Sequence, residues 1–130
     1  MEIQATSKYA RISPRKMQLL AKSIIAMSAR QATTTLGFIN KSGAIILQKV
    51  IASAIANAKN RANVAPDELI IKQIQVLPGS AMKRFRAVSR GMAHEYKKRM
   101  SHIKVILAEK PKVEITVVQK EKTEEKTKKI

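Results

Sequence analysis

The 130-residue chain contains no cysteine and no tryptophan. Without cysteine it forms neither disulfide bonds nor thiolate metal sites, which fits a reducing compartment. It has no run of about 18 apolar residues, so no transmembrane helix is expected. The N-terminal segment MEIQATSKYAR has an acid at its second position and no apolar stretch. We therefore expect neither a secretory signal nor a membrane association.

Acidic residues are also scarce, and this argues against an enzyme. Only five precede residue 111: Glu2, Asp67, Glu68, Glu95 and Glu109. The sequence has no glycine-rich phosphate loop and no nucleophile with a base at a useful spacing. His94 and His102 have no His, Cys or carboxylate partner at metal-ligand spacing. We expect no catalytic residue, no cofactor, no metal site and no small-molecule substrate.

Basic residues, in contrast, dominate the chain. There are 26 Lys and Arg against 9 Asp and Glu, a formal net charge of +17. A charge of this size seeks a polyanion, while an apolar fraction of 45% is ordinary for a folded domain. We expect one domain over residues 1–110 and a flexible extension over 111–130, because EKTEEKTKKI cannot bury enough apolar surface. Before that segment, VEITVV (113–118) predicts a short strand.

Three helices are predicted from caps and apolar periodicity. The first follows Ser13 as a cap, with Pro14 at the first helical position. Its apolar stripe repeats at three- and four-residue steps: Met17, Leu20, Ala21, Ile24 and Met27. A shorter helix follows Ser28 and ends near Gly37. A third begins after Ser42 as its cap and has one apolar and one small side, typical of a helix sandwiched between a sheet and another helix or a partner.

Three strands are predicted, and two of them continue into a hairpin. EIQATSK (2–8) indicates an edge strand, and LIIKQIQV (69–76) and MSHIKVIL (100–107) indicate two more. An unstructured loop as long as 77–99 is unusual inside a compact domain. We therefore expect these residues to form the arms of a hairpin over about 77–100 that projects about 35 Å.

This hairpin carries the densest charge of the chain. Its segment KRFRAVSRGMAHEYKKR (83–99) holds seven Lys or Arg, one Glu and no apolar run. A lone two-stranded ribbon is marginally stable, so we expect it to be mobile until a partner binds. Phosphates would offset the charge, and Phe85 and Tyr96 would stack on unpaired bases. A run of charged residues is more commonly a solvated face. A projecting basic segment without a core of its own, however, favours nucleic acid as the binding partner.

Two further groups of residues are candidates for contacts with nucleic acid. One cluster surrounds the start of the first helix: Lys8, Arg11, Arg15 and Lys16. With the exposed N–H groups there it would hold phosphate, although a purely solvated role stays open. Asn57, Asn60 and Asn63 recur near the end of the third helix, where capping and contacts to ribose or base edges are both consistent with the pattern.

Three stretches together resemble the ribosomal large-subunit protein family twenty-two: RISPRKMQLLAKSI, KVIASAIANAKN and IQVLPGSAMKRFRAVSRGMAHEYKKRMSHIKVIL. The resemblance covers Tyr9 to Glu109 in order and spacing. It implies an α+β fold with three helices packed on a small three-stranded antiparallel sheet and a long projecting β-hairpin. It also implies a structural constituent of the large subunit that contacts several domains of its RNA and neighbouring ribosomal proteins, and supports assembly. The hairpin tip would help line the polypeptide exit tunnel, beside the nascent polypeptide.

Charge pattern and resemblance together predict the site residues. The expected RNA-binding residues are Lys8, Arg11, Ser13, Arg15, Lys16, Asn57, Asn60, Lys83, Arg84, Arg86, Arg90, Lys97, Lys98, Arg99, Ser101 and His102. The expected tunnel-lining tip comprises Met82, Lys83, Arg84, Arg86, Ala87, Val88, Ser89, Arg90, Gly91 and Met92. The chain departs from the family pattern at Ile25 and Ala26, where an Arg-Gly pair is common, and at Ala87 and Met92, where proline and arginine are common.

Charge alone leaves a second function open, that of a free nucleic-acid chaperone or nucleoid-type binding protein. Such a protein would bind many sequences with fast exchange, whereas a ribosomal protein would bind one folded RNA. The resemblance favours the ribosome, in the cytoplasm of a bacterium or in an organelle.

Overall fold

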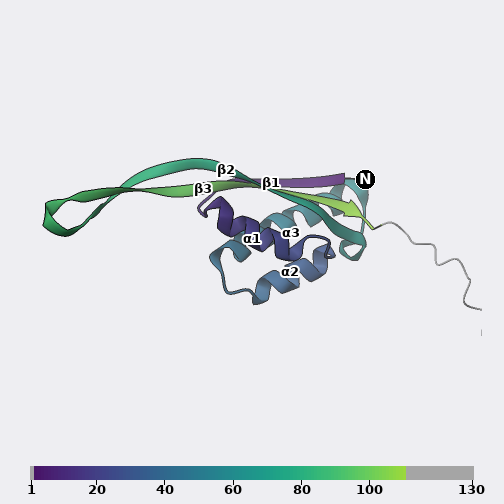
Figure 1. Ribbon diagram of the computed structural model, residues 1–130. Helices are drawn as coiled ribbons and strands as arrows, with labels where there is room; N and C mark the ends of the chain where they lie inside the picture. The colour runs from purple at the N-terminus through teal and green to yellow at the C-terminus, as the bar shows by residue number, and fades with distance from the viewer. Residues whose placement is uncertain (1, 111–130) are drawn as a thin grey trace, which may run out of the picture.

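The computed structural model describes residues 2–110. A long two-stranded arm leaves one end of a domain in which helices cover one face of a sheet (Figure 1). The elements are β1 (Glu2–Ala10), α1 (Pro14–Ile24), α2 (Ala29–Phe38), α3 (Ser42–Ala62), β2 (Leu69–Ala87) and β3 (Ala93–Glu109), with short 3₁₀ turns η1 (Pro66–Glu68) and η2 (Ser89–Gly91). The predicted α+β fold is confirmed. The strand expected over 113–118 lies outside the described residues.

The sheet has the order β1-β3-β2, with both pairings antiparallel, so β1 is an edge strand as predicted. The central strand β3 shows the expected two-residue period. Its residues on the helix side are buried: Ser101, Ile103, Val105 and Leu107. The alternate residues His102, Lys104 and Ile106 are half-buried on the opposite face.

The apolar stripes of the helices meet the buried face of the sheet. Four of the five stripe residues predicted for α1 are buried: Met17, Leu20, Ala21 and Ile24. The fifth, Met27, lies beyond the helix and is partly buried. Helix α3 packs on β1 and β3 and also on α2, so it lies between the sheet and another helix as predicted, but the small side on which that prediction depended does not make the second contact. Its small side, with Ala52 and Ala56, is exposed.

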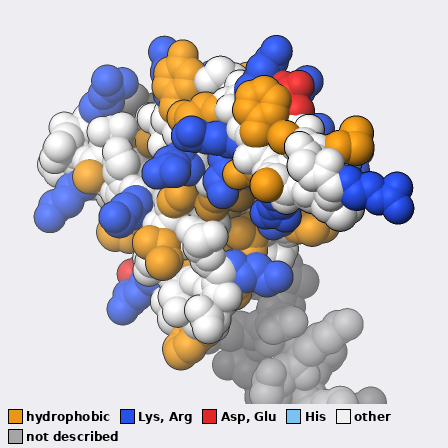
Figure 2. All heavy atoms as spheres, turned by 90° about the vertical axis from the view of Figure 1, so that its left-hand side faces the viewer, with side chains coloured by type: hydrophobic (Ala, Val, Ile, Leu, Met, Phe, Trp, Pro, Cys, Tyr) orange, Lys and Arg blue, Asp and Glu red, His pale blue; other side chains and the backbone are white. Residues whose placement is uncertain are grey.

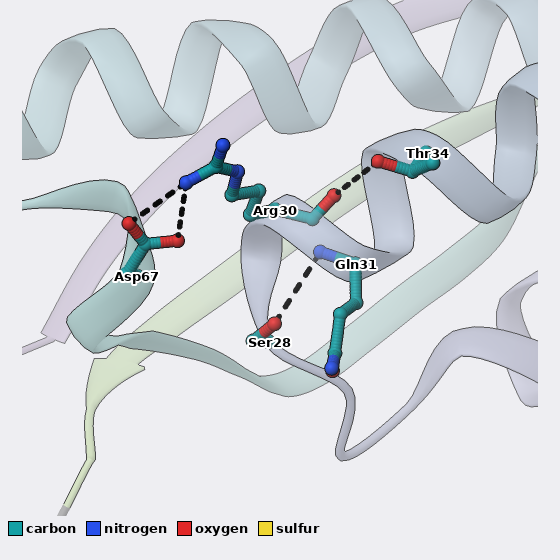
Figure 3. Close-up of polar contacts among 5 residues, drawn as sticks. All are labelled: Ser28, Arg30, Gln31, Thr34 and Asp67. Carbon is teal, nitrogen blue, oxygen red and sulfur yellow. Dashed lines mark hydrogen bonds and ion pairs between the residues drawn. The ribbon is translucent and has the colours of Figure 1, made fainter.

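The helix starts differ in how they are capped. Ser28 is the N-cap of α2, and its Oγ accepts a hydrogen bond of 3.3 Å from the Gln31 amide (Figure 3). Ser13 occupies the N-cap of α1, but its side chain makes no cap hydrogen bond. The prediction for α3 was wrong by one residue, because Lys41 is the N-cap and Ser42 is already helical.

The helix ends lie close to the predicted ones. Helix α2 runs to Phe38, one residue beyond Gly37, so the glycine lies within the last turn and is not the C-cap. Asn63 caps the C-terminus of α3 in a left-handed conformation with φ 54°, and its N–H donates to the Lys59 carbonyl. Asparagine tolerates this conformation better than most residues, which explains its place there.

The connection between α1 and α2 covers the outer edge of β2. The Ala26 amide donates to the Ile71 carbonyl at 3.2 Å, and the Ile71 amide donates to the Met27 carbonyl at 3.0 Å. Near this contact, Arg30 Nη1 lies 3.2 and 3.1 Å from the two carboxylate oxygens of Asp67 (Figure 3). The first residues of β2, around Ile71, therefore do not present an open strand edge.

Candidate nucleic-acid interface

Beyond the domain, β2 and β3 continue to pair from Ala81 opposite Arg99 to Ala87 opposite Ala93. The predicted hairpin is thus present with a defined register. Every residue from 80 to 99 is exposed, so the arm has no core of its own. The seven basic residues of this arm are all exposed.

Side-chain alternation gives the ribbon two faces of similar character. One face carries the cross-strand pairs Met82–Lys98, Arg84–Tyr96 and Arg86–His94. The other carries Lys83–Lys97, Phe85–Glu95 and Ala87–Ala93. Each face therefore combines an aromatic ring with cations, the combination that binds single-stranded or looped nucleic acid.

Local contacts within the ribbon leave most of its charge unbalanced. Lys83 lies opposite Lys97, a repulsive pair, and its Nζ is 3.9 Å from Glu95 Oε1. Arg86 lies over the Tyr96 ring, 5.5 Å from its centroid. The Phe85 side chain is 72% exposed. Only one carboxylate thus faces the seven cations, and two aromatic rings remain accessible.

The tip is a tight turn in which two residues have positive φ. Arg90 has φ 61° and ψ 31°, and Gly91 has φ 71°. The Met92 amide donates to the Ser89 carbonyl at 3.4 Å, which closes a four-residue turn of the mirror-image class preferred in hairpins. The Arg90 side chain is consequently presented at the far end of the arm. The expected tip residues before Val88 belong to the paired arm.

At the root of the hairpin, His102 is a hydrogen-bond acceptor. The Tyr9 amide donates to His102 Nδ1 at 3.0 Å, and the two rings meet edge to face with centroids 4.7 Å apart. A Cβ on Gly79 would lie 3.3 Å from the His102 ring, so glycine permits this close approach. The β2 register shifts here, between Pro78 and Ala81. His102, predicted above as an RNA contact, thus makes a hydrogen bond within the fold, and its contact with RNA stays a prediction.

Two predicted RNA contacts have a different environment from the one expected. Ser101 is fully buried, and its hydroxyl has no hydrogen-bond partner among the described residues. Its side chain is enclosed by the fold and does not belong to the exposed interface. Asn57 Nδ2 donates to the Gln4 carbonyl at 3.3 Å, a structural contact to the edge strand. Asn60 is exposed and stays a candidate.

The structure joins the two basic clusters that are far apart in the sequence. A concavity of about 410 Å³ lies at the hairpin root. It is lined by Arg11, Ile12, Ser13, Lys16, Ser42, Lys97, Lys98 and Arg99. Lys8 and Arg15 do not line it. Figure 2, viewed from the hairpin side, shows Lys and Arg side chains spread over this end of the molecule and few acidic ones.

Two participants of this region are not predicted by sequence reasoning. Ser42 is predicted only as a cap, and Tyr9 has no predicted role. The position of Ser42 at a helix start could have predicted its place in the concavity, because helix starts present free N–H groups. No local pattern connects Tyr9 with His102, 93 residues later.

No helix within residues 2–110 is both long and apolar enough to cross a membrane. In the same residues, no three His, Cys, Asp or Glu side chains are grouped as a metal site would require. A basic domain with a charged, aromatic-bearing ribbon and a cationic hollow belongs to the class of nucleic-acid-binding proteins.

Comparison with known proteins specifies the family. The family model described as Ribosomal protein L22p/L17e matches residues 5–108. The chain is 45% identical to the large ribosomal subunit protein uL22 of Akkermansia muciniphila, over 84% of this chain and 97% of that protein. It is 47% identical to the protein of that name from Desulfotalea psychrophila, over 84% and 99%. It is 44% identical to the protein of that name from Thermus thermophilus, over 85% of this chain and 97% of that protein. The chain belongs to the ribosomal protein L22p/L17e family, which comprises structural proteins and not enzymes.

Proposed function

We propose that this chain is a structural constituent of the large ribosomal subunit, where it binds ribosomal RNA and contacts neighbouring ribosomal proteins. The observation that carries the proposal is the hairpin, whose paired register extends to Ala87 opposite Ala93 while every residue from 80 to 99 is exposed. Such a ribbon is stabilised by a partner that supplies phosphates and unpaired bases. Family membership supports the RNA of the large subunit as that partner.

Within this function, the hairpin acts as a probe that passes between segments of RNA. Both of its faces carry cations and an aromatic ring, so RNA can surround it on two sides. Its contacts then reach several RNA domains and support assembly by holding those domains together. The globular part remains outside, where β1 and the helices meet neighbouring proteins.

The tip forms part of the wall of the polypeptide exit tunnel and lies beside the nascent polypeptide. A tight turn at Arg90 and Gly91 keeps the end of the arm narrow, and Val88 and Met92 flank it with exposed apolar surface. The ribosome that contains the chain is cytoplasmic and of the bacterial type, as the bacterial relatives suggest.

Sedimentation of the tagged chain from a cell lysate tests the proposal. The expected result is that the chain travels with large subunits and remains there after a wash in high salt. A matched variant lacking residues 83–99 should incorporate less or yield aberrant particles. If the intact chain spreads over nucleic acid of every size and washes off readily, the chaperone or nucleoid function replaces the ribosomal one.

A further inference from the structure

The concavity at the hairpin root, called here the root pocket, collects cations from separate parts of the chain. Arg11 comes from the connection between β1 and α1, Lys16 comes from the first turn of α1, and Lys97, Lys98 and Arg99 come from β3. Among the described residues no carboxylate lines it. Five like charges around one hollow of about 410 Å³ repel one another. An anion in the hollow would convert this repulsion into attraction.

Backbone groups at the same place also favour an anion. The helices α1 and α3 both begin here, with Ser13 as the N-cap of one and Ser42 as the first residue of the other. Neither helix start has a side-chain cap hydrogen bond. In α3 the Ala44 amide donates to the Lys41 carbonyl at 2.9 Å, which leaves the Ser42 and Gly43 amides, and in α1 those of Arg15 and Lys16, without a partner in their own helix. The positive ends of two helix dipoles add to the five cations. Two serine hydroxyls supply further donors.

We propose that the root pocket binds several consecutive phosphates of a sharply bent RNA strand. This rests on the proposed function, which supplies the RNA, although the phosphate chemistry is shared with free polyphosphate. Each backbone phosphate carries a single negative charge, so five cations call for more than one phosphate. A bend in the strand is what brings neighbouring phosphates into one hollow instead of along a groove.

The bound phosphates would also fix the direction of the hairpin. Lys97, Lys98 and Arg99 lie on the exposed arm, whereas Arg11 and Lys16 belong to the domain. The register of the arm shifts between Pro78 and Ala81, next to Arg99. Phosphates held from both sides bridge this irregular point. RNA binding at the root therefore reduces bending of the whole arm.

Titration of the full chain with tripolyphosphate, followed by calorimetry and amide chemical shifts, tests the pocket directly. We expect saturable binding with shifts at the first amides of the two helices, those of Arg15 and Lys16 in α1 and of Ser42 and Gly43 in α3. The double variant Arg11→Gln/Lys16→Gln should weaken binding about tenfold or more, because charge-assisted hydrogen bonds are lost. The matched pair Lys22→Gln/Lys59→Gln removes the same charge from exposed sites outside the pocket and should change it less than about twofold. Equal losses for the two pairs would overturn the proposal.

Two further measurements identify the source of the phosphates and the effect on the arm. Protein-free large-subunit ribosomal RNA should displace tripolyphosphate from the pocket, and bound tripolyphosphate should slow hydrogen exchange over residues 81–87 and 93–99. RNA that binds without displacing it, or exchange that stays unchanged, would contradict the proposal. The outcome is separable from the sedimentation test. A chain that joins large subunits but binds no tripolyphosphate refutes the pocket alone, whereas one that binds it but never joins subunits refutes the ribosomal function.

Discussion

Tyr9 and His102 are 93 residues apart in the chain, yet the amide of the first donates to Nδ1 of the second at 3.0 Å. Tyr9 has φ 56°, a left-handed conformation that is costly for a bulky residue. It lies in the irregular stretch of β1 between Ser7 and Ala10. The hydrogen bond and the edge-to-face ring contact hold this strained residue at the point where the hairpin leaves the sheet.

The variant His102→Ala should therefore lower the free energy of unfolding by about 1–2 kcal/mol, because the Tyr9 amide loses its acceptor. Asparagine places an oxygen close to the position of Nδ1, so His102→Asn should recover part of the loss. His94→Ala, on the exposed arm, is the matched control and should change the value by less than about 0.5 kcal/mol. Urea unfolding followed by circular dichroism measures all three. Similar stabilities of the two alanine variants would show that the contact has no structural role.

Ala26 has φ 68°, a left-handed conformation that glycine adopts more readily than alanine. The substitution Ala26→Gly should raise the free energy of unfolding by about 1 kcal/mol, because glycine adopts this conformation without strain. The hydrogen bonds of this segment to Ile71 use backbone atoms and remain. The control Ala52→Gly, at an exposed position within α3, should instead lower it by about 1 kcal/mol. A loss of stability in both variants would mean that the strain at Ala26 is relieved in another way.

The charges of the arm should act on RNA binding and not on folding. Arg84→Gln/Arg86→Gln should leave the urea midpoint unchanged, because both side chains are exposed. It should reduce the slope of log K against log salt by about 0.7–0.9 for each phosphate that the arm no longer neutralises. Filter binding to ribosomal RNA across a series of KCl concentrations gives this slope. The pair Lys22→Gln/Lys59→Gln serves again as the control. An unchanged slope in the arm variant would exclude these two arginines from the phosphate-binding surface.

The pKa of Glu2 is held below its ordinary value, first by a hydrogen bond from Lys72 and then by the charge of Lys72. A lowered carboxyl pKa stabilises the fold at pH values above the unfolded pKa, and the contribution disappears as the pH falls through the folded one. Glu2→Gln should accordingly reduce the urea midpoint slightly at pH 7 and not at all at low pH. Both residues are exposed, so added salt should shrink the difference. A difference that grows toward low pH would contradict the assignment.

Local patterns predicted much of this structure. The three- and four-residue steps from Met17 to Ile24 and the alternation from Ser101 to Leu107 predicted a helix and a strand, because burial on one face follows directly from backbone periodicity. The length of the segment between the two strands, residues 77–99, predicted the hairpin, because an unstructured loop of that length is unusual in a compact domain. Its charge predicted a polyanionic partner, since no core could account for it.

Other features depend on contacts that no local pattern records. The burial of Ser101 follows from the strand period, yet a family motif placed it among the RNA contacts, and the period was the better guide. The Asn57 amide meets Gln4 across 53 residues, so its spacing within α3 could not separate the two predicted roles. The root pocket likewise exists only once α1 and β3 are packed together.

Limited trypsin digestion of the chain, free and within purified large subunits, tests most directly whether the exposed basic arm is embedded in RNA. We predict rapid cleavage after Arg84, Arg86 and Lys97 in the free chain, because all three are exposed. In the subunit the same sites should be protected until the RNA is digested with ribonuclease. Cleavage at equal rates in both samples would show that the arm projects into solvent, and this would contradict its proposed place within the RNA.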